Sequence, residues 1–394
     1  MRLIRGKSIA SIRERIKTAP LQNLKSTFDS VLTSSITTIH ESNRVLLPDF
    51  KSCLTILKLQ RKTNIPKLPA SRDQIILCNE WSKCLDGERF LLPTTYKDIL
   101  IFSTDKSLTR LCKCETIYMD GTFGRCCQLF SQLYTIHGLY KGFVVPLVYV
   151  LLGNKTACLY NKMFNELKDY LFQINRVWNP DVIMTDFESG LIEVIKHQFP
   201  RALHTGCLFH YCNAIWTNVQ HLGLVVQYRE IAEVAEFIQL TMALSFLPIN
   251  EVVNRFQACV DRLSNVHYVL LTHFIDYFRS TWLDGIFSLK MWNHFLCDNN
   301  HRTNNRIESW HATLKHKIPS KPNIFILIKN LQSEEALGNI SWHKAEIGEE
   351  PPARRRKYVL FEKSLEKTWD SFQRNELTVE DMHRRVRHYI RKFK

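Results

Sequence analysis

The sequence contains no apolar run long enough to cross a membrane. Its longest, residues 142–153 (GFVVPLVYVLLG), is shorter than the about 20 apolar residues that a spanning helix needs, and it contains Pro146. The N-terminal residues (MRLIRGKSIASIRERIK) lack the apolar core of a secretory signal. We therefore expect a soluble intracellular protein with no membrane partner, and we predict a buried strand at residues 142–153.

The sequence also lacks an ordered cysteine framework. Its 12 cysteines follow no regular spacing, which argues against a secreted disulfide scaffold and favours a reducing compartment. Before residue 66 no Cys/His spacing matches a zinc finger.

Acidic residues are the minority among the charged ones. The chain of 394 residues carries 53 Lys and Arg against 38 Asp and Glu, a formal net charge of +15. Polyanions are the expected partners of such a surface, nucleic acid first and acidic membrane second. Charge alone does not decide between a nucleic-acid-binding protein and a basic protein that binds neither.

Hydrophobic patterning divides the chain into segments. Apolar residues recur at helical spacing near the N-terminus and again within residues 222–300. Between these two segments lie three adjoining strand-like runs, followed by alternating strands and helices. This order predicts an α/β fold with a mixed sheet flanked by helices. The predicted segments are a basic helical N-terminal region (1–87), the first part of the core (88–221), an all-helical insertion (222–300), the last core helices with a third acid (301–347) and a basic C-terminal tail (348–394).

Three carboxylates stand where the pattern changes structural type: Asp120 in YMDGTF, Asp186 in VIMTDFESG and Glu308 in RTNNRIESWHATLKH. Each has a structural alternative. Asp-Gly is typical of a hairpin turn, Asp186 precedes a predicted helix that it can cap, and Glu308 stands three residues after Asn305, as in a capping box. Taken singly, each acid is more often structural than catalytic.

Taken together, the three acids suit a metal site. Two Mg²⁺ ions about 3.5–4 Å apart can activate an attacking oxygen and stabilise a leaving one in phosphoryl transfer. Mg²⁺ prefers carboxylate oxygens and water to His or Cys, and basic residues can hold the phosphate backbone. The acids therefore predict a site for Mg²⁺, or for Mn²⁺ in its place.

A compact Cys/His cluster follows a predicted strand. Cys207-x-x-His210 has His204 and Cys212 nearby, but a structural zinc site needs four ligands and this spacing is too compressed. We interpret the cluster as a buried cysteine with a hydrogen-bonded histidine at the start of a helix.

Six ordered motifs over residues 88–337 resemble the Mutator-like element (MULE) transposase family. They are YMDGTF, FSQLYTIHG, VVPLVYVLLGNKT, MTDFESG, GCLFHYCNAIW and TNNRIESWHATL. The resemblance implies an RNase H-like fold with a helical insertion between the second Asp and the Glu. It also implies a catalytic, metal-binding DDE triad of Asp120, Asp186 and Glu308.

Further residues match family elements. Cys207 and His210 correspond to a Cys-x-x-His element, and Trp310 and His311 to the Trp-His that follows the family's glutamate. Two features depart from the family pattern. Ser309 stands where the family has glycine, and no complete FLYWCH or WRKY zinc finger is present, so recognition of DNA ends is either lost or performed by the N-terminal helices and the tail.

The resemblance implies metal-dependent cleavage and transfer of DNA strands in the nucleus, by a homo-oligomer acting on transposon terminal repeats and target DNA. A basic cluster, residues 354–357 (RRRK), is either a nuclear localisation signal or a phosphate-binding patch. The main alternative is a domesticated DNA-binding transcriptional regulator that keeps the fold without transposing. In a third interpretation the acids serve only as caps and turns.

Overall fold

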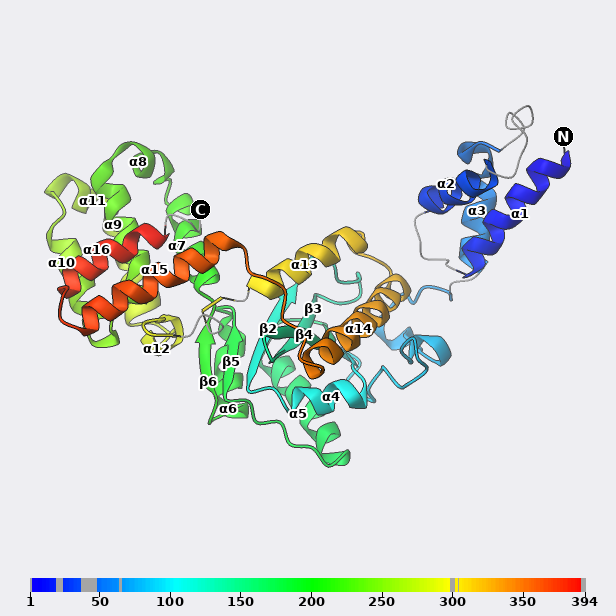
Figure 1. The fold of residues 1–394 in the computed structure, drawn as a ribbon, viewed down its shortest axis with the longest axis horizontal. Coiled ribbons are helices and arrows are strands. Elements are labelled where there is room, and N and C mark those ends of the chain that lie inside the picture. The colour runs from blue at the N-terminus through cyan, green and yellow to red at the C-terminus, as the bar shows by residue number, and fades with distance from the viewer. Residues whose placement is uncertain are drawn as a thin grey trace.

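The computed structural model describes residues 2–18, 24–36, 48–63, 66–297, 302–303 and 305–390. Figure 1 shows three regions along the molecule: three N-terminal helices at one end, a sheet covered by helices in the middle, and a lobe of helices at the other end. We call these the N-terminal helices, the sheet region and the helical lobe. Within the described residues, every helix is too short or too polar to span a membrane.

The N-terminal helices form a small bundle with its own apolar core. They are α1 (Arg2–Thr18), α2 (Leu24–Ile36) and α3 (Phe50–Thr63). The helical spacing of the apolar residues gives α1 and α3 one buried face each, on which Ile12, Ile16 and Leu57 contact Phe28 of α2. The predicted helices in this region are confirmed.

In the described residues six strands form one mixed sheet in the order β1-β4-β3-β2-β5-β6. The strands are β1 (Ile99–Phe102), β2 (Thr116–Thr122), β3 (Gln132–Tyr140), β4 (Phe143–Leu152), β5 (Val182–Thr185) and β6 (Leu203–Gly206). The first four pair antiparallel, and β2-β5-β6 pair parallel because helices connect them. The α/β fold with a mixed sheet is confirmed, and Leu91 adds an isolated bridge to Phe102 of β1.

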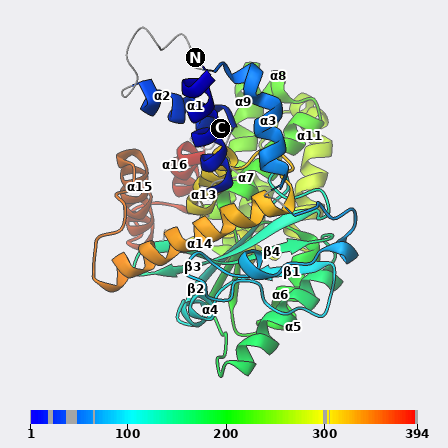
Figure 2. The same ribbon diagram turned by 90° about the vertical axis from the view of Figure 1, so that its right-hand side faces the viewer.

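Helices cover both faces of the sheet. One face packs on α4 (Asp105–Leu111), α5 (Ala157–Gln173) and α6 (Ser189–Gln198), and the other on α13 (Asn305–Lys317) and α14 (Ile324–Glu346). Figure 2 shows α14 crossing above the strands and α5 and α6 below them. Because side chains alternate along a strand, Ile117 and Met119 of β2 enter the first core, whereas Tyr118 points to the opposite face.

The helical lobe has a separate core that is rich in aromatic rings. Its helices are α7 (Leu208–His221), α8 (Val225–Glu230), α9 (Ala232–Ala243), α10 (Val252–Asp261), α11 (Asn265–Phe278) and α12 (Leu289–Trp292), and α15 (Arg356–Gln373) and α16 (Val379–Ile390) pack with them.

Short 3-10 segments occur before the sheet, at Arg72–Gln74 and Asn79–Trp81, and in the lobe, at Leu244–Phe246 and Ile249–Glu251. A π segment lies at Arg279–Leu283.

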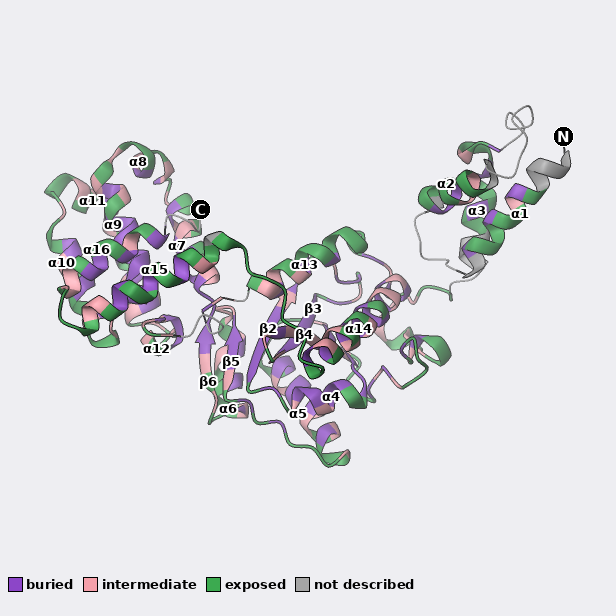
Figure 3. Ribbon diagram, in the orientation of Figure 1, coloured by how far each residue is buried: buried purple, intermediate pink, exposed green. Residues whose placement is uncertain are grey.

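The C-terminal residues take part in this second core. Leu365 and Trp369 of α15 and Val386 of α16 are buried against the helices of residues 222–297, and α16 lies along α9. In Figure 3 these two helices show buried faces toward the lobe and exposed faces outward. The last basic residues expected in the tail, from 391 on, lie outside the described residues. The sequence predicted a basic tail over residues 348–394, and in the structure most of that tail forms α15 and α16.

Candidate metal centre and adjoining groove

The sheet brings the two aspartates together. Strands β2 and β5 pair parallel with Tyr118 opposite Met184, and the same offset continued by two residues sets Asp120 beside Asp186. Asp120 lies inside β2, opposite Thr135 of β3, so the hairpin-turn alternative is wrong. The N-cap residue of α6 is Glu188, so Asp186 does not cap that helix. Strand alternation directs both aspartates to the face covered by α13.

Helix α13 brings the third acid to the same face. Glu308 and His311 are three residues apart on α13, so their side chains lie on one side of the helix. The His311 Nδ1 atom is 3.5 Å from Asp120 Oδ2, which sets this side of α13 against β2. Trp310 points elsewhere: its Nε1 donates to the Glu334 carboxylate on α14 at 2.7 Å. We infer that Trp310 holds α13 in place.

Helix α7 supplies a fourth element of the site. Cys207 is the buried N-cap residue of α7, and His210 lies in its first turn. The Nε2 atom of His210 is 3.3 Å from Glu308 Oε1. Ligand atoms of Asp120, His210 and Glu308 all lie within 4.8 Å of one another, although three separate parts of the sequence contribute them.

The site concentrates negative charge away from water. Asp120 is 4% exposed, and burial together with the charge of Asp186 raises its pKa to about 7. Burial also raises the pKa of Asp186. Burial opposes a charged His210, but the neighbouring Cys207 and Glu308 outweigh it and raise the pKa of His210 to about 11. The same contact with His210 lowers the pKa of Glu308, so these two form an ion pair.

The donor set fits a divalent cation. Carboxylate oxygens from Asp120 and Glu308 are suitable for Mg²⁺ or Mn²⁺. The imidazole of His210 is a further donor, close enough to both oxygens to bind the same cation. Asp186 is outside this group, but its charge acts on Asp120 and is itself influenced by Glu308 and His210. A cation would relieve the repulsion that raises the pKa of Asp120. The fit therefore rests on both donor chemistry and electrostatics.

A groove of about 960 Å³ begins at Glu308 and runs toward the linker before α15. Four basic residues line it: Arg306, Lys344, Arg354 and Arg355. Some of their charge is already balanced, since Lys344 pairs with Glu349 at 2.7 Å and Arg354 with Glu362 at 3.8 Å. The groove also contains exposed apolar surface from Leu337, Ile340 and Tyr358. It thus offers both positive charge and an aromatic ring beside Glu308, whereas Asp120 and Asp186 do not line it.

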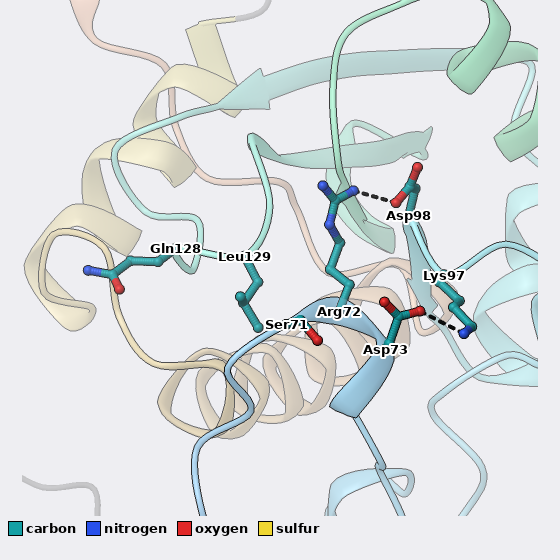
Figure 4. Close-up of a pocket in the computed structure, with 7 residues that line it drawn as sticks. All are labelled: Ser71, Arg72, Asp73, Lys97, Asp98, Gln128 and Leu129. Atoms are coloured by element: carbon teal, nitrogen blue, oxygen red, sulfur yellow. Dashed lines mark hydrogen bonds and ion pairs between the residues drawn. The ribbon is translucent and has the colours of Figure 1, made fainter.

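A second cavity, of about 470 Å³, lies at the β1 edge of the sheet (Figure 4). Its charged groups satisfy one another: Arg72 pairs with Asp98, and Lys97 with Asp73 at 2.6 Å. None of the residues singled out by the sequence motifs lines this cavity. We assign it no role in the candidate site.

The sequence pattern did not predict that His210 lies near the acids. It indicated a hydrogen bond between Cys207 and His210, whereas the structure brings His210 into contact with Glu308, nearly 100 positions away in the chain. No spacing within one segment signals a contact made through the packing of α7 against α13. The approach of His311 to Asp120 was likewise not foreseen from the Trp-His pair.

Comparison with known protein families gives one match. Residues 116–214 match the family model of the MULE transposase domain. The match includes Asp120, Asp186, Cys207 and His210 and ends before Glu308. No curated protein matches the chain. Residues 116–214 therefore carry a MULE transposase domain, which supports the predicted resemblance to the MULE transposase family.

Proposed function

We propose that this protein is a DDE-type DNA transposase, or a protein derived from one, that catalyses metal-dependent cleavage and transfer of DNA strands. The observation that carries the proposal is the convergence of Asp120 and Glu308, from β2 and α13, beside Asp186 in a chain with a MULE transposase domain. Asp120 is buried and Asp186 half-buried, and burial raises the pKa of both carboxyl groups, a combination that is common at functional sites and costly elsewhere.

We assign the sheet to an RNase H-like core. The order β1-β4-β3-β2-β5-β6 supports this assignment, because four strands pair antiparallel and β5 and β6 then continue the sheet parallel to β2. The helices α8 to α12 stand between β6 and α13 and would be the insertion that separates the second Asp from the Glu. On this assignment the helical lobe is an addition to the catalytic core, and its last two helices come from the C-terminus.

Asp120, Asp186 and Glu308 would hold Mg²⁺ or Mn²⁺. When bound, the cations would supply Lewis-acid chemistry, lowering the pKa of an attacking oxygen and stabilising the leaving one. The chain's own residues position this chemistry. The Trp310–Glu334 hydrogen bond ties α13 to α14, and burial lowers the pKa of His311 to about 4, so that it stays neutral beside Asp120.

DNA is the proposed substrate, as transposon terminal repeats and as target. The net charge of +15 and the basic residues of the groove that starts at Glu308 support this proposal. Arg354 and Arg355 line this groove and are exposed, so they can contact the phosphate backbone. Action in the nucleus and as a homo-oligomer on DNA are parts of the same proposal.

A supercoiled plasmid incubated with the full chain and Mn²⁺ or Mg²⁺ tests the proposal, because nicking relaxes it whatever the end sequence. We expect metal-dependent relaxation, which Asp186→Ala reduces by roughly 10³-fold or more while the protein stays folded. Retained cleavage in Asp186→Ala would refute the assignment of that residue. The exposed Asp261→Ala on α10 is the control.

The second candidate is a DNA-binding regulator without transposition activity. The basic groove favours it to the extent that phosphate contacts by Arg354 and Arg355 need no metal. Salt-sensitive DNA binding, unaffected by Asp186→Ala and without metal-dependent relaxation of the plasmid, would support this alternative.

A further inference from the structure

We propose that His210 is itself a ligand of the catalytic metal, through Nε2, beside one oxygen each of Asp120 and Glu308. This inference rests on the proposed function and extends it, because a DDE triad contains no nitrogen donor. The three donor atoms lie within 4.8 Å of one another, and Nε2 of His210 faces Glu308 at 3.3 Å. A cation placed among them would displace the proton that pairs His210 with Glu308, and would then have two carboxylates and one neutral imidazole as ligands.

The position of His210 in the fold suits a ligand. The residue follows the N-cap Cys207 by three positions, so both side chains lie on the same side of the first turn of α7. Cys207 is fully buried at the N-cap, and the Nδ1 atom of His210 is shielded from solvent, with no hydrogen-bond partner among the described residues. Nε2 is the ring nitrogen that faces Glu308, so it is the one placed to bind a cation.

His311 is the competing nitrogen donor and is less well placed. Its Nδ1 is 3.5 Å from Asp120 Oδ2, yet it is not a member of the group at ligand distance. It is 5% exposed, and its Nε2 has no hydrogen-bond partner within the described part of the chain. This buried, polar ring beside Asp120 is a second sign that the space is built for a ligand. An experiment must nevertheless separate the two histidines.

A mixed donor set changes the choice of metal. Imidazole favours Mn²⁺ and the later first-row ions over Mg²⁺, whereas an all-carboxylate site suits Mg²⁺. We therefore expect the protein to bind Mn²⁺ more tightly than Mg²⁺. His210→Gln, which keeps a polar side chain next to Glu308 but removes the imidazole, should reduce the affinity for Mn²⁺ by roughly tenfold or more.

Pulsed electron paramagnetic resonance of the Mn²⁺-loaded full chain tests the ligand directly. We expect a ¹⁴N coupling from a bound imidazole, replaced by a ¹⁵N coupling when the protein is made with ¹⁵N-histidine. The coupling should disappear in His210→Gln and remain in His311→Gln. It should also remain in His221→Gln, which changes an exposed histidine at the other end of α7. Circular dichroism establishes that each variant is folded.

Three results would overturn the proposal, and they separate it from the proposed function. Mn²⁺ that binds without nitrogen coupling, and whose binding is abolished in Asp120→Asn, leaves the acid site intact but removes His210 from it. A coupling that disappears in His311→Gln and persists in His210→Gln would show that the nitrogen ligand is His311 of α13 and not His210 of α7. If the wild-type chain binds no Mn²⁺, the metal site of the proposed function fails together with this inference.

Discussion

The sheet region and the helical lobe bury polar groups in different ways. In the lobe, two buried indoles reach backbone carbonyls: Trp292 Nε1 donates to the carbonyl of Trp282 at 3.0 Å, and Trp369 Nε1 to that of Phe246 at 3.1 Å. In the sheet region, Asp120 is buried among other charges, with a pKa raised to about 7. Paired polar groups stabilise a fold, whereas crowded like charges weaken it. The acids are therefore better explained by function than by folding.

The strongest test of this contrast is Asp120→Asn. If the carboxylate serves chemistry, the variant should lose metal-dependent plasmid relaxation by roughly 10³-fold or more. Its unfolding midpoint in urea should stay the same or rise, because the amide removes a charge that burial and Asp186 disfavour. A variant that loses stability as well as activity would show that Asp120 supports the fold.

Leu365→Ala probes the other side of the comparison, with an expected loss of about 2–5 kcal/mol in the free energy of unfolding. Leu365 is fully buried on α15 against the helical lobe, so truncation leaves a cavity. Leu360→Ala, on the same helix but 56% exposed, should cost no more than about 0.5 kcal/mol. Urea denaturation measures both. Equal, small effects would mean that α15 behaves as a loosely attached tail.

Elements that depend on local sequence patterns could be predicted, whereas features that depend on contacts between distant parts of the chain could not. Strand β5 (Val182–Thr185) and helix α5 (Ala157–Gln173) lie where the sequence predicted them, because each has a strong local pattern and a clear boundary. Helix α15 was missed because it begins inside a run of four bases, residues 354–357, which indicates a signal or a phosphate patch as readily as a helix. Its buried stripe gains meaning only through the lobe it packs against.

The candidate site was predictable in part for the same reason. Asp120 and Asp186 could be expected at one edge of the sheet, because each ends or follows an apolar strand. That they lie beside each other depends on the pairing of β2 with β5. Glu308 came from the family motif, and the structure sets it close to Asp120. The contact of His210 with Glu308 could not be predicted, since it depends on the packing of two helices from distant parts of the chain.

The pH dependence of stability sharpens the contrast from the side of the lobe. Burial lowers the pKa of His383 to about 4, and its Nε2 donates to the carbonyl of Leu240 at 2.8 Å. The unfolded chain binds a proton near pH 6.5 and the folded one only near pH 4, so stability falls as the pH drops through this window. Between pH 7.5 and 5 this group should cost about 2 kcal/mol.

Urea titrations at several pH values measure this loss, and His383→Gln should reduce it. Part of the loss should remain, because burial also lowers the pKa of His294 in the same lobe, to about 3. His221→Gln changes an exposed histidine and should leave the wild-type pH dependence unaltered. If His383→Gln shows the full wild-type loss between pH 7.5 and 5, acid sensitivity arises elsewhere.

The smallest expected effect concerns the linker that joins the two regions. The double variant Arg354→Ala/Arg355→Ala removes two charges from the groove beside Glu308. We expect DNA affinity to fall by roughly tenfold, and the slope of log affinity against log salt to decrease by about 0.9 for each phosphate that the protein no longer neutralises. Fluorescence anisotropy of a labelled duplex at several salt concentrations measures both. Lys363→Ala/Lys367→Ala removes the same charge from the exposed side of α15 and should change neither as much. Equal decreases in affinity in the two double variants would mean that DNA affinity depends on the overall charge of the protein, and the groove would then not be a specific DNA-binding site.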